Sequence, residues 1–154
     1  MPADSEPALP GLPHTWRPLG PRLAGIIFGA ALLVVFGFAW FSFDDETRAK
    51  FTAFQLGTLV FLGLLAFSCM FALIRSRVVA EAERLVVVNG YRRREFAWAQ
   101  IVAIHLPPGA PWATIDLADG TTTAVMGIQG SDGDRARRAV RDLRRLANAQ
   151  ARPS

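Results

Sequence analysis

Three consecutive arginines, Arg92, Arg93 and Arg94, follow the turn-forming pair Asn89-Gly90. Guanidinium groups bind carboxylates, phosphates and anionic headgroups, so this cluster is the first candidate for ligand contact. Successive side chains on a strand point to opposite faces, however, and Arg93 should point away from Arg92 and Arg94. We favour a solvated strand whose arginine stems cover apolar surface. Contact with anionic lipid, or with a protein or other ligand, is the alternative.

The other polar residues form no recognisable catalytic or metal-binding motif. His105 lies between two aliphatic residues, as a structural strand histidine does. No spacing of cysteine, histidine and carboxylate predicts a metal site, and Asp132 with Asp134 lacks the remaining ligands of a calcium loop. Segment 127–130 lacks the Lys-Ser/Thr ending of a phosphate loop. We therefore expect no enzymatic activity, no catalytic residue, no metal and no cofactor.

The basic character of the chain raises the possibility of nucleic-acid binding. The calculated pI is near 10.5, and a basic surface is the electrostatic footprint of such proteins. No helix-turn-helix, zinc or RNP motif accompanies it. Anionic lipid explains the charge more simply, so we expect no nucleic-acid partner.

Two apolar segments, uncharged apart from Arg22 at the start of the first, must position the basic region. Hydrophobic residues make up 51% of the chain and charged residues 19%, and the apolar excess is concentrated in residues 22–43 and 54–74. Each segment has the roughly 20 residues that a helix needs to cross a ~30 Å hydrocarbon layer. Neither shows an amphipathic stripe. With the short extracytoplasmic loop 44–53 between them, they predict an antiparallel transmembrane hairpin.

Orientation follows from the flanking cations. Arg75 and Arg77 follow the second segment, ahead of the arginine cluster, whereas the loop holds only Arg48 and Lys50. The excess of cations predicts that the C-terminal part is cytoplasmic. With two spans the N-terminus is cytoplasmic too, in a multi-pass cell-membrane protein. Arg75 and Arg77 are then placed to reach lipid headgroups.

Small residues in the two segments predict close helix packing. Gly25 and Gly29 form a small-xxx-small pattern in the first segment, which lets helix backbones approach in lipid. We favour packing against the second segment, where Gly57 and Gly63 are also small. A contact between copies, giving a homo-oligomer, is the alternative.

The segments on either side of the hairpin differ in character. Residues 1–21 contain six prolines and predict a disordered cytoplasmic tail, with Trp16 at the membrane interface. Residues 75–150 predict a folded domain, followed by a short tail, 151–154. Its short apolar runs predict six strands, at 78–82, 85–88, 91–97, 101–106, 112–117 and 121–128.

Turn and helix signals complete the domain. Asn89-Gly90 predicts a type I′ hairpin turn, and Asp119-Gly120 predicts a second tight turn. Ser131 or Asp132 is expected to cap a C-terminal helix. That helix has one apolar face, formed by Ala136, Ala139, Val140, Leu143, Leu146 and Ala147. The predicted fold class is α+β: a transmembrane hairpin, then a small antiparallel sheet or partial barrel capped by an amphipathic helix.

Short strands followed by one amphipathic helix are the order of a pleckstrin-homology (PH) fold. Three stretches carry a closer resemblance: RLVVVNGYRRREFAWAQIVAI (84–104), APWATIDLADGTT (110–122) and AVMGIQGSDGDRARRAVRDL (124–143). They resemble the bacterial PH-like domain family of small actinobacterial membrane proteins, including low molecular weight protein antigen 6-like proteins. The resemblance implies a membrane-tethered interaction module that binds a membrane or cytoplasmic protein, or membrane lipids, and has no catalytic residues.

Eukaryotic PH domains that bind phosphoinositides carry basic residues in the loop between their first two strands. In our assignment that loop is Ala82-Glu83-Arg84, with a single cation. The resemblance therefore does not predict headgroup recognition there.

The predicted orientation can be measured with fusions after Ser154. A reporter active only in the cytoplasm should be active at that position, because the arginine bias retains this end inside. A reporter active only outside the cytoplasm should be silent there. The opposite pattern, or release of the full chain from membranes by carbonate, would contradict the predicted hairpin.

Overall fold

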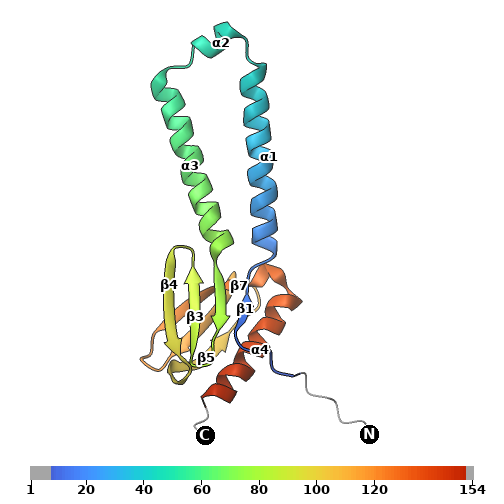
Figure 1. Cartoon of the computed structure of the whole chain (residues 1–154), viewed down its shortest axis with the longest axis vertical. Helices are drawn as coiled ribbons and strands as arrows, with labels where there is room; N and C mark the ends of the chain where they lie inside the picture. Colours follow the sequence, from blue (N-terminus) through green and yellow to red (C-terminus); the bar gives the residue numbers. More distant parts are fainter. Residues whose placement is uncertain (1–7, 152–154) are drawn as a thin grey trace, which may run out of the picture. The chain divides into compact units, whose positions relative to one another are not determined.

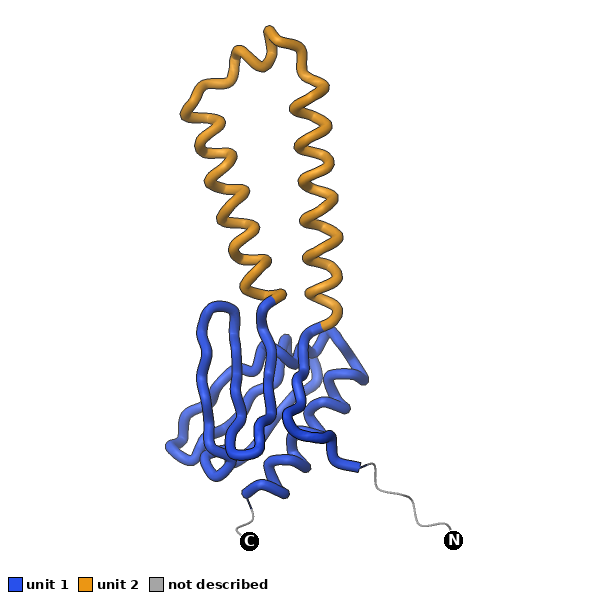
Figure 2. Tube along the Cα trace, viewed as in Figure 1, with its two compact units in different colours: residues 1–18, 75–154 blue, residues 19–74 orange. Residues whose placement is uncertain are grey.

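The structure of the chain, a computed structural model, describes residues 8–151. It consists of two compact units (Figure 2). The first unit combines the described residues up to Pro18 with those from Arg75 onward, and the second comprises residues 19–74. The first unit is therefore built from two separate stretches of the chain.

The second unit is the predicted helical hairpin. Helix α1 spans Gly20–Ser42, and helix α3 spans Ala53–Arg75. Both are long and apolar enough to cross a membrane by length and composition. The loop between them contains a short helix that the sequence did not predict, α2 (Asp45–Ala49), whose start is capped by the Asp44 carboxylate accepting from the Thr47 N–H at 3.3 Å.

The first unit contains two antiparallel sheets (Figure 1). The four-stranded sheet has the order β1-β2-β3-β4, with strands β1 (His14–Trp16), β2 (Arg77–Ala80), β3 (Arg84–Asn89) and β4 (Arg92–Ala97). The three-stranded sheet has the order β5-β6-β7, with strands β5 (Ile101–His105), β6 (Trp112–Leu117) and β7 (Thr122–Gln129). A 3₁₀ turn, η1 (Trp98–Gln100), leads from one sheet to the other. A second, η2 (Gly130–Asp132), precedes helix α4 (Asp134–Gln150).

Strand β1 lies inside the segment 1–21 for which we expected disorder, and that expectation is wrong for residues 14–16. The strand pairs antiparallel with β2, with His14 opposite Ala80 and Trp16 opposite Val78. Trp16, which we expected at the membrane interface, packs against the core of the first unit. We expected disorder because of the composition of the segment alone. Composition does not show that the edge of β2 offers backbone hydrogen-bonding groups with which these residues can pair. Residues 1–7 of the predicted tail lie outside the described residues.

The core of the first unit is the one that the sequence periodicity predicts. Alternate residues of β6 are buried, and the whole predicted apolar face of α4 is buried. The side chains of Leu85, Ile115 and Leu143 are wholly buried, joining the two sheets and α4 in one cluster. Helix α4 packs against β5 and β7 (Figure 1). Its N-cap is Gly133, with φ 55°, and not Ser131 or Asp132, because η2 takes up those two residues.

The turn between β3 and β4 differs from the predicted type I′ turn. Its central residues are Gly90 and Tyr91, and Gly90 alone has positive φ, at 60°. Glycine at the first central position is the requirement of a type II′ turn. Asn89 therefore ends β3, and its side chain is free to reach the other sheet.

Two close contacts join the sheets where β7 passes β2 and β3. The Asn89 Nδ2 donates to the Ala124 carbonyl at 2.6 Å, and its Oδ1 accepts from the Met126 N–H at 2.9 Å. At Gly127 a Cβ would lie 2.6 Å from the carbonyl carbon of Arg77 and 2.7 Å from the nitrogen of Val78. Only a glycine fits against that backbone.

Substituting Gly127→Ala should destabilise the first unit by about 1–3 kcal/mol, because the added methyl must push β7 away from β2. The measurement is thermal unfolding of the full chain in detergent, followed by near-UV circular dichroism. Gly11→Ala is the matched control, since nothing lies within 4 Å of its added Cβ. Equal melting temperatures for the two variants would show that β7 and β2 are not in close contact.

Candidate functional site

Strand β4 divides the three arginines between its two faces, as strand geometry predicts. Phe96 is buried in the core, and Arg92 and Arg94 share its face of the strand. The Arg94 Nη1 lies 3.4 Å from the hydroxyl of Thr123 on β7. Arg93 lies on the opposite, outer face.

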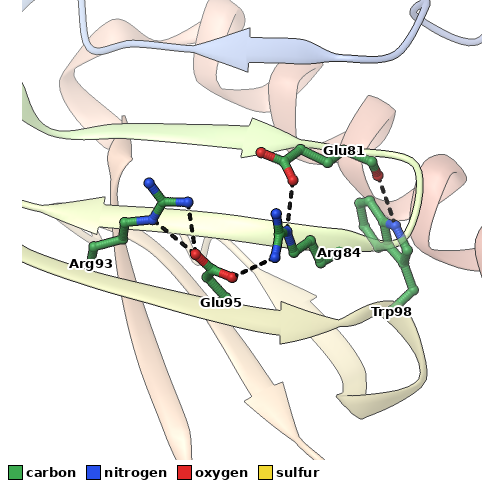
Figure 3. A network of polar contacts seen from close by, with 5 residues as sticks. All are labelled: Glu81, Arg84, Arg93, Glu95 and Trp98. Carbon is green, nitrogen blue, oxygen red and sulfur yellow. Dashed lines mark hydrogen bonds and ion pairs between the residues drawn. The ribbon is translucent and has the colours of Figure 1, made fainter.

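Arg93 belongs to a network of charged side chains on the outer face of the four-stranded sheet (Figure 3). The Glu95 carboxylate accepts from Arg93 at 2.7 Å and from Arg84 at 2.8 Å. The second carboxylate of the network, that of Glu81, accepts from Arg84 at 2.7 Å. Two arginines thus face two glutamates, and the charges within this network compensate one another.

Arg84 is the centre of that network. Its hydrogen bond to Glu81 and the charges of Glu81 and Glu95 raise its pKa above the ordinary arginine value, so it stays charged. The Glu81 backbone carbonyl accepts from the indole Nε1 of Trp98 at 3.0 Å. The network is half-exposed, so water and salt screen its ion pairs and each contributes little to stability.

The network covers apolar residues of β3. Val86 and Val88 lie on the outer face but are only 3% and 4% exposed. Their cross-strand partners on β4 are Glu95 and Arg93. The aliphatic stems of these charged side chains are thus placed beside the two valines, where such stems can shield apolar surface from water.

Arg77 and Arg93 are brought to one face. Arg77 lies opposite Val88 on β3, and Val88 lies opposite Arg93 on β4. The three residues form a row across the sheet. Arg75, at the end of α3, is exposed. The five predicted contact arginines therefore do not form one pocket.

Gly25 and Gly29 share Met70 as a packing partner in the second unit. A Cβ at Gly25 would lie 3.1 Å from the Met70 Cγ, and one at Gly29 would lie 3.3 Å from the Met70 Sδ. Gly57 and Gly63 have nothing within 4 Å of an added Cβ, so the expectation that they supply the second helix's contact is wrong. The flexible thioether of Met70 fills the groove that small residues leave in α1.

His105 has a partner that sequence reasoning missed. Its Nε2 lies 2.9 Å from Asp116 Oδ2, and the Thr122 hydroxyl donates to the other oxygen of Asp116 at 2.8 Å. The contact between His105 and Asp116 depends on the register of β5 against β6, which the sequence alone does not determine. The hydroxyl bonds the carboxylate and not the imidazole, so this is not the arrangement of an activated nucleophile. Within residues 8–151, no group of three His, Cys, Asp or Glu side chains is placed to hold a metal ion.

The loop between the first two strands is not the one assigned from the sequence. Because β1 precedes α1, residues 17–76 connect the first strand to the second. Ala82 and Glu83 belong to the next connection, and Arg84 is already the first residue of β3. The two apolar helices thus occupy the position of the loop that carries basic residues in phosphoinositide-binding PH domains. Residues 82–84 therefore do not correspond to the headgroup-binding loop of those domains, and their single cation does not bear on headgroup recognition.

Comparison with known proteins agrees with this fold. The family model of the bacterial PH domain matches residues 75–146. Uncharacterized proteins of two Mycobacterium tuberculosis strains and of Mycobacterium bovis are each 31% identical to the chain over 146 residues, covering 92% of it and 88% of the relative. The chain belongs to the bacterial PH domain family. No solved structure matches it significantly.

The mycobacterial match reaches well beyond the PH domain itself. It covers 146 residues, whereas the family model covers residues 75–146. The alignment therefore includes much of the sequence ahead of the domain, where α1 and α3 lie.

Substituting Gly25→Ile should weaken the contact between α1 and α3 by about 1–3 kcal/mol, because the branched side chain overlaps Met70. Met70→Ala in the same chain should recover part of the loss by making room. The measurement is unfolding of the full chain by added SDS in detergent micelles. Gly57→Ile is the control and should change little. Lost dimers with an unchanged hairpin would favour the homo-oligomer contact instead.

Proposed function

We propose that the chain is a membrane-anchored PH-like interaction module, without catalytic activity, that binds a protein partner at the cytoplasmic face of the membrane. Membership of the bacterial PH domain family supports a role as an interaction module. The observation that carries the proposal is the insertion of two apolar helices between the paired strands β1 and β2. Because both helices come between β1 and β2 in the chain, a membrane anchor formed by them would be connected to the sheet at both of its ends.

Double attachment supports a positional mechanism. Three residues separate β1 from α1, and one residue, Ser76, separates α3 from β2. Paired strands hold the two connections about 5 Å apart. With both helices in the membrane, the domain is confined to a thin layer at its surface. Confinement raises its effective concentration for partners in the same layer.

The cytoplasmic orientation rests on charge. Arg75, Arg77 and the β4 arginines follow the second helix, which favours retention of this side in the cytoplasm. The pairing of β1 with β2 requires the chain before α1 and the chain after α3 to lie on one side of the membrane. An even number of crossings between them, as in a hairpin, meets this requirement.

A second candidate function is sensing of anionic lipid through the juxtamembrane and hairpin arginines. Arg92, Arg94, Arg75 and Arg77 carry charge outside the glutamate network. Each cation near an anionic surface can contribute about 1 kcal/mol. Against this candidate, Arg84 and Arg93 are already paired with carboxylates, and the remaining cations point to different faces of the sheet.

The proposed function can be tested with a photo-crosslinking amino acid in the full chain in its native membrane. Position 91 is suitable because Tyr91 is exposed and aromatic. A discrete protein adduct, identified by mass spectrometry, is expected. Incorporation in place of Phe41 in α1 is the control, because that position should yield membrane adducts only. No protein adduct from any exposed position of the first unit would contradict a protein partner.

The lipid candidate has its own measurement. Polymer-extracted particles containing the full chain should be enriched in anionic phospholipid if the arginines recruit it. Replacing Arg75, Arg77, Arg92 and Arg94 by glutamine should then remove the enrichment, and added salt should weaken it. An enrichment that is absent, or unchanged in the variant, would rule lipid sensing out.

A further inference from the structure

We propose that the free edge of strand β4 binds an acidic, extended segment of a partner protein as an added strand. The inference rests on the proposed function, because it specifies how the partner would be held and what chemistry it has. Strand β4 is the last strand of the four-stranded sheet. An edge strand presents unpaired backbone groups, which makes it a template for a further strand.

The other sheet edges are protected. Strand β1 has three residues between Pro13 and Pro18, and proline cannot donate to a further strand. Strand β7 lies against the other sheet at Gly127. Strand β5 has a register irregularity near Ile101, and its Ile104 carbonyl accepts from Arg144 of α4 at 2.8 Å. Strand β4 has six residues, a regular register with β3, and no proline.

The backbone groups available on β4 follow from the hairpin register. The two-residue turn makes Asn89 and Arg92 a hydrogen-bonded pair, and bonded pairs then alternate along the hairpin. Arg92, Arg94 and Phe96 therefore bond to β3, whereas Arg93, Glu95 and Ala97 point their backbone groups outward. The Ala97 N–H donates to the Gln100 side chain at 2.9 Å. Within residues 8–151, nothing bonds the outward N–H and C=O groups of Arg93 and Glu95.

Charge selects the occupant. Strand β4 carries three arginines and one glutamate, and that glutamate is already shared by Arg84 and Arg93. A strand added alongside would place its side chains opposite Arg92, Arg93 and Arg94. Opposite charges in cross-strand pairs are favourable and like charges are unfavourable. An acidic segment therefore fits the edge, and a basic one does not.

A second copy of the chain fits less well than an acidic segment. Two β4 strands would each bring a net charge of +2, from three arginines and one glutamate. In the two-fold register centred on Arg94, that residue would face its own copy at close range. The arginines thus protect the edge against self-association while leaving it open to a negatively charged partner.

The test uses the full chain in nanodiscs of phosphatidylcholine, which carry no net lipid charge. The probe is a fluorescein-labelled peptide with three consecutive glutamates flanked by Val-Thr pairs, and binding is read by fluorescence anisotropy. Binding is expected. The same peptide with lysines for glutamates should not bind. A version with alternate amides methylated keeps its charge but cannot donate to β4, and it should also fail to bind.

Chain variants separate charge from strand addition. Arg92→Glu with Arg94→Glu should weaken binding about tenfold or more, since two favourable pairs become repulsive. Arg138→Glu with Arg141→Glu, on the exposed side of α4, is the control matched in charge and should have no effect. Arg93→Ala and Arg93→Pro remove the same charge, but only proline removes the outward N–H. Weaker binding by the proline variant than by the alanine variant, at equal melting temperature, is expected.

Three results would overturn the assignment of the β4 edge. Failure of the acidic probe to bind is one, and equal binding of the methylated probe, which indicates charge attraction alone, is another. The third is a dimer of the full chain that Arg94→Glu disrupts or strengthens without any probe binding, which would make a second copy the occupant. A protein adduct obtained by crosslinking in the membrane, together with any of these, would leave the proposed function standing and remove only the edge assignment.

Discussion

The antiparallel pairing of β1 with β2 is the contact on which the organisation of this chain depends. It joins the residues before the helical hairpin to those after it, so that residues 17–76 become an insertion within one sheet. Closing so long a connection costs conformational entropy in a flexible chain. An antiparallel helical hairpin already returns the chain toward its starting point and reduces that cost. The helical hairpin therefore favours the pairing of β1 with β2, and residues 14–16 are part of the sheet.

The same sheet explains the arrangement of charge. On its outer face, arginines and glutamates pair above Val86 and Val88, so part of the basic cluster has a covering role. At its free edge, the arginines of β4 lie beside backbone groups that have no partner among the described residues. The residues of β4 thus cover the outer face of the sheet and also form a positively charged edge strand. The total charge of the chain could not distinguish these two situations.

Much of the fold was predictable from local patterns. The long apolar runs predicted both long helices, short apolar runs between turn signals predicted the six strands after residue 75, and the apolar face of α4 is buried as expected. The errors have two origins. Strand β1 and the turn at Gly90 and Tyr91 depend on strand pairing and its register, whereas the Gly133 cap follows from the 3₁₀ turn η2 just before it. Of the candidate site, the division of Arg92, Arg93 and Arg94 between two faces was predictable. The pairing of Arg93 with Glu95 and Arg84, the contact of Met70 with Gly25, and the bond between His105 and Asp116 were not.

By itself the sequence determined where the chain is apolar enough to span a membrane, where it forms strands after residue 75, and which face of α4 is buried, since these follow from hydrophobic patterns within short windows. Only the tertiary structure decided that the N-terminal segment completes the sheet, that the two helices are inserted between its strands, and which backbone edge stays open. The physical reason is that a strand satisfies its hydrogen bonds through a neighbour chosen by the fold. A helix satisfies its own within a few residues.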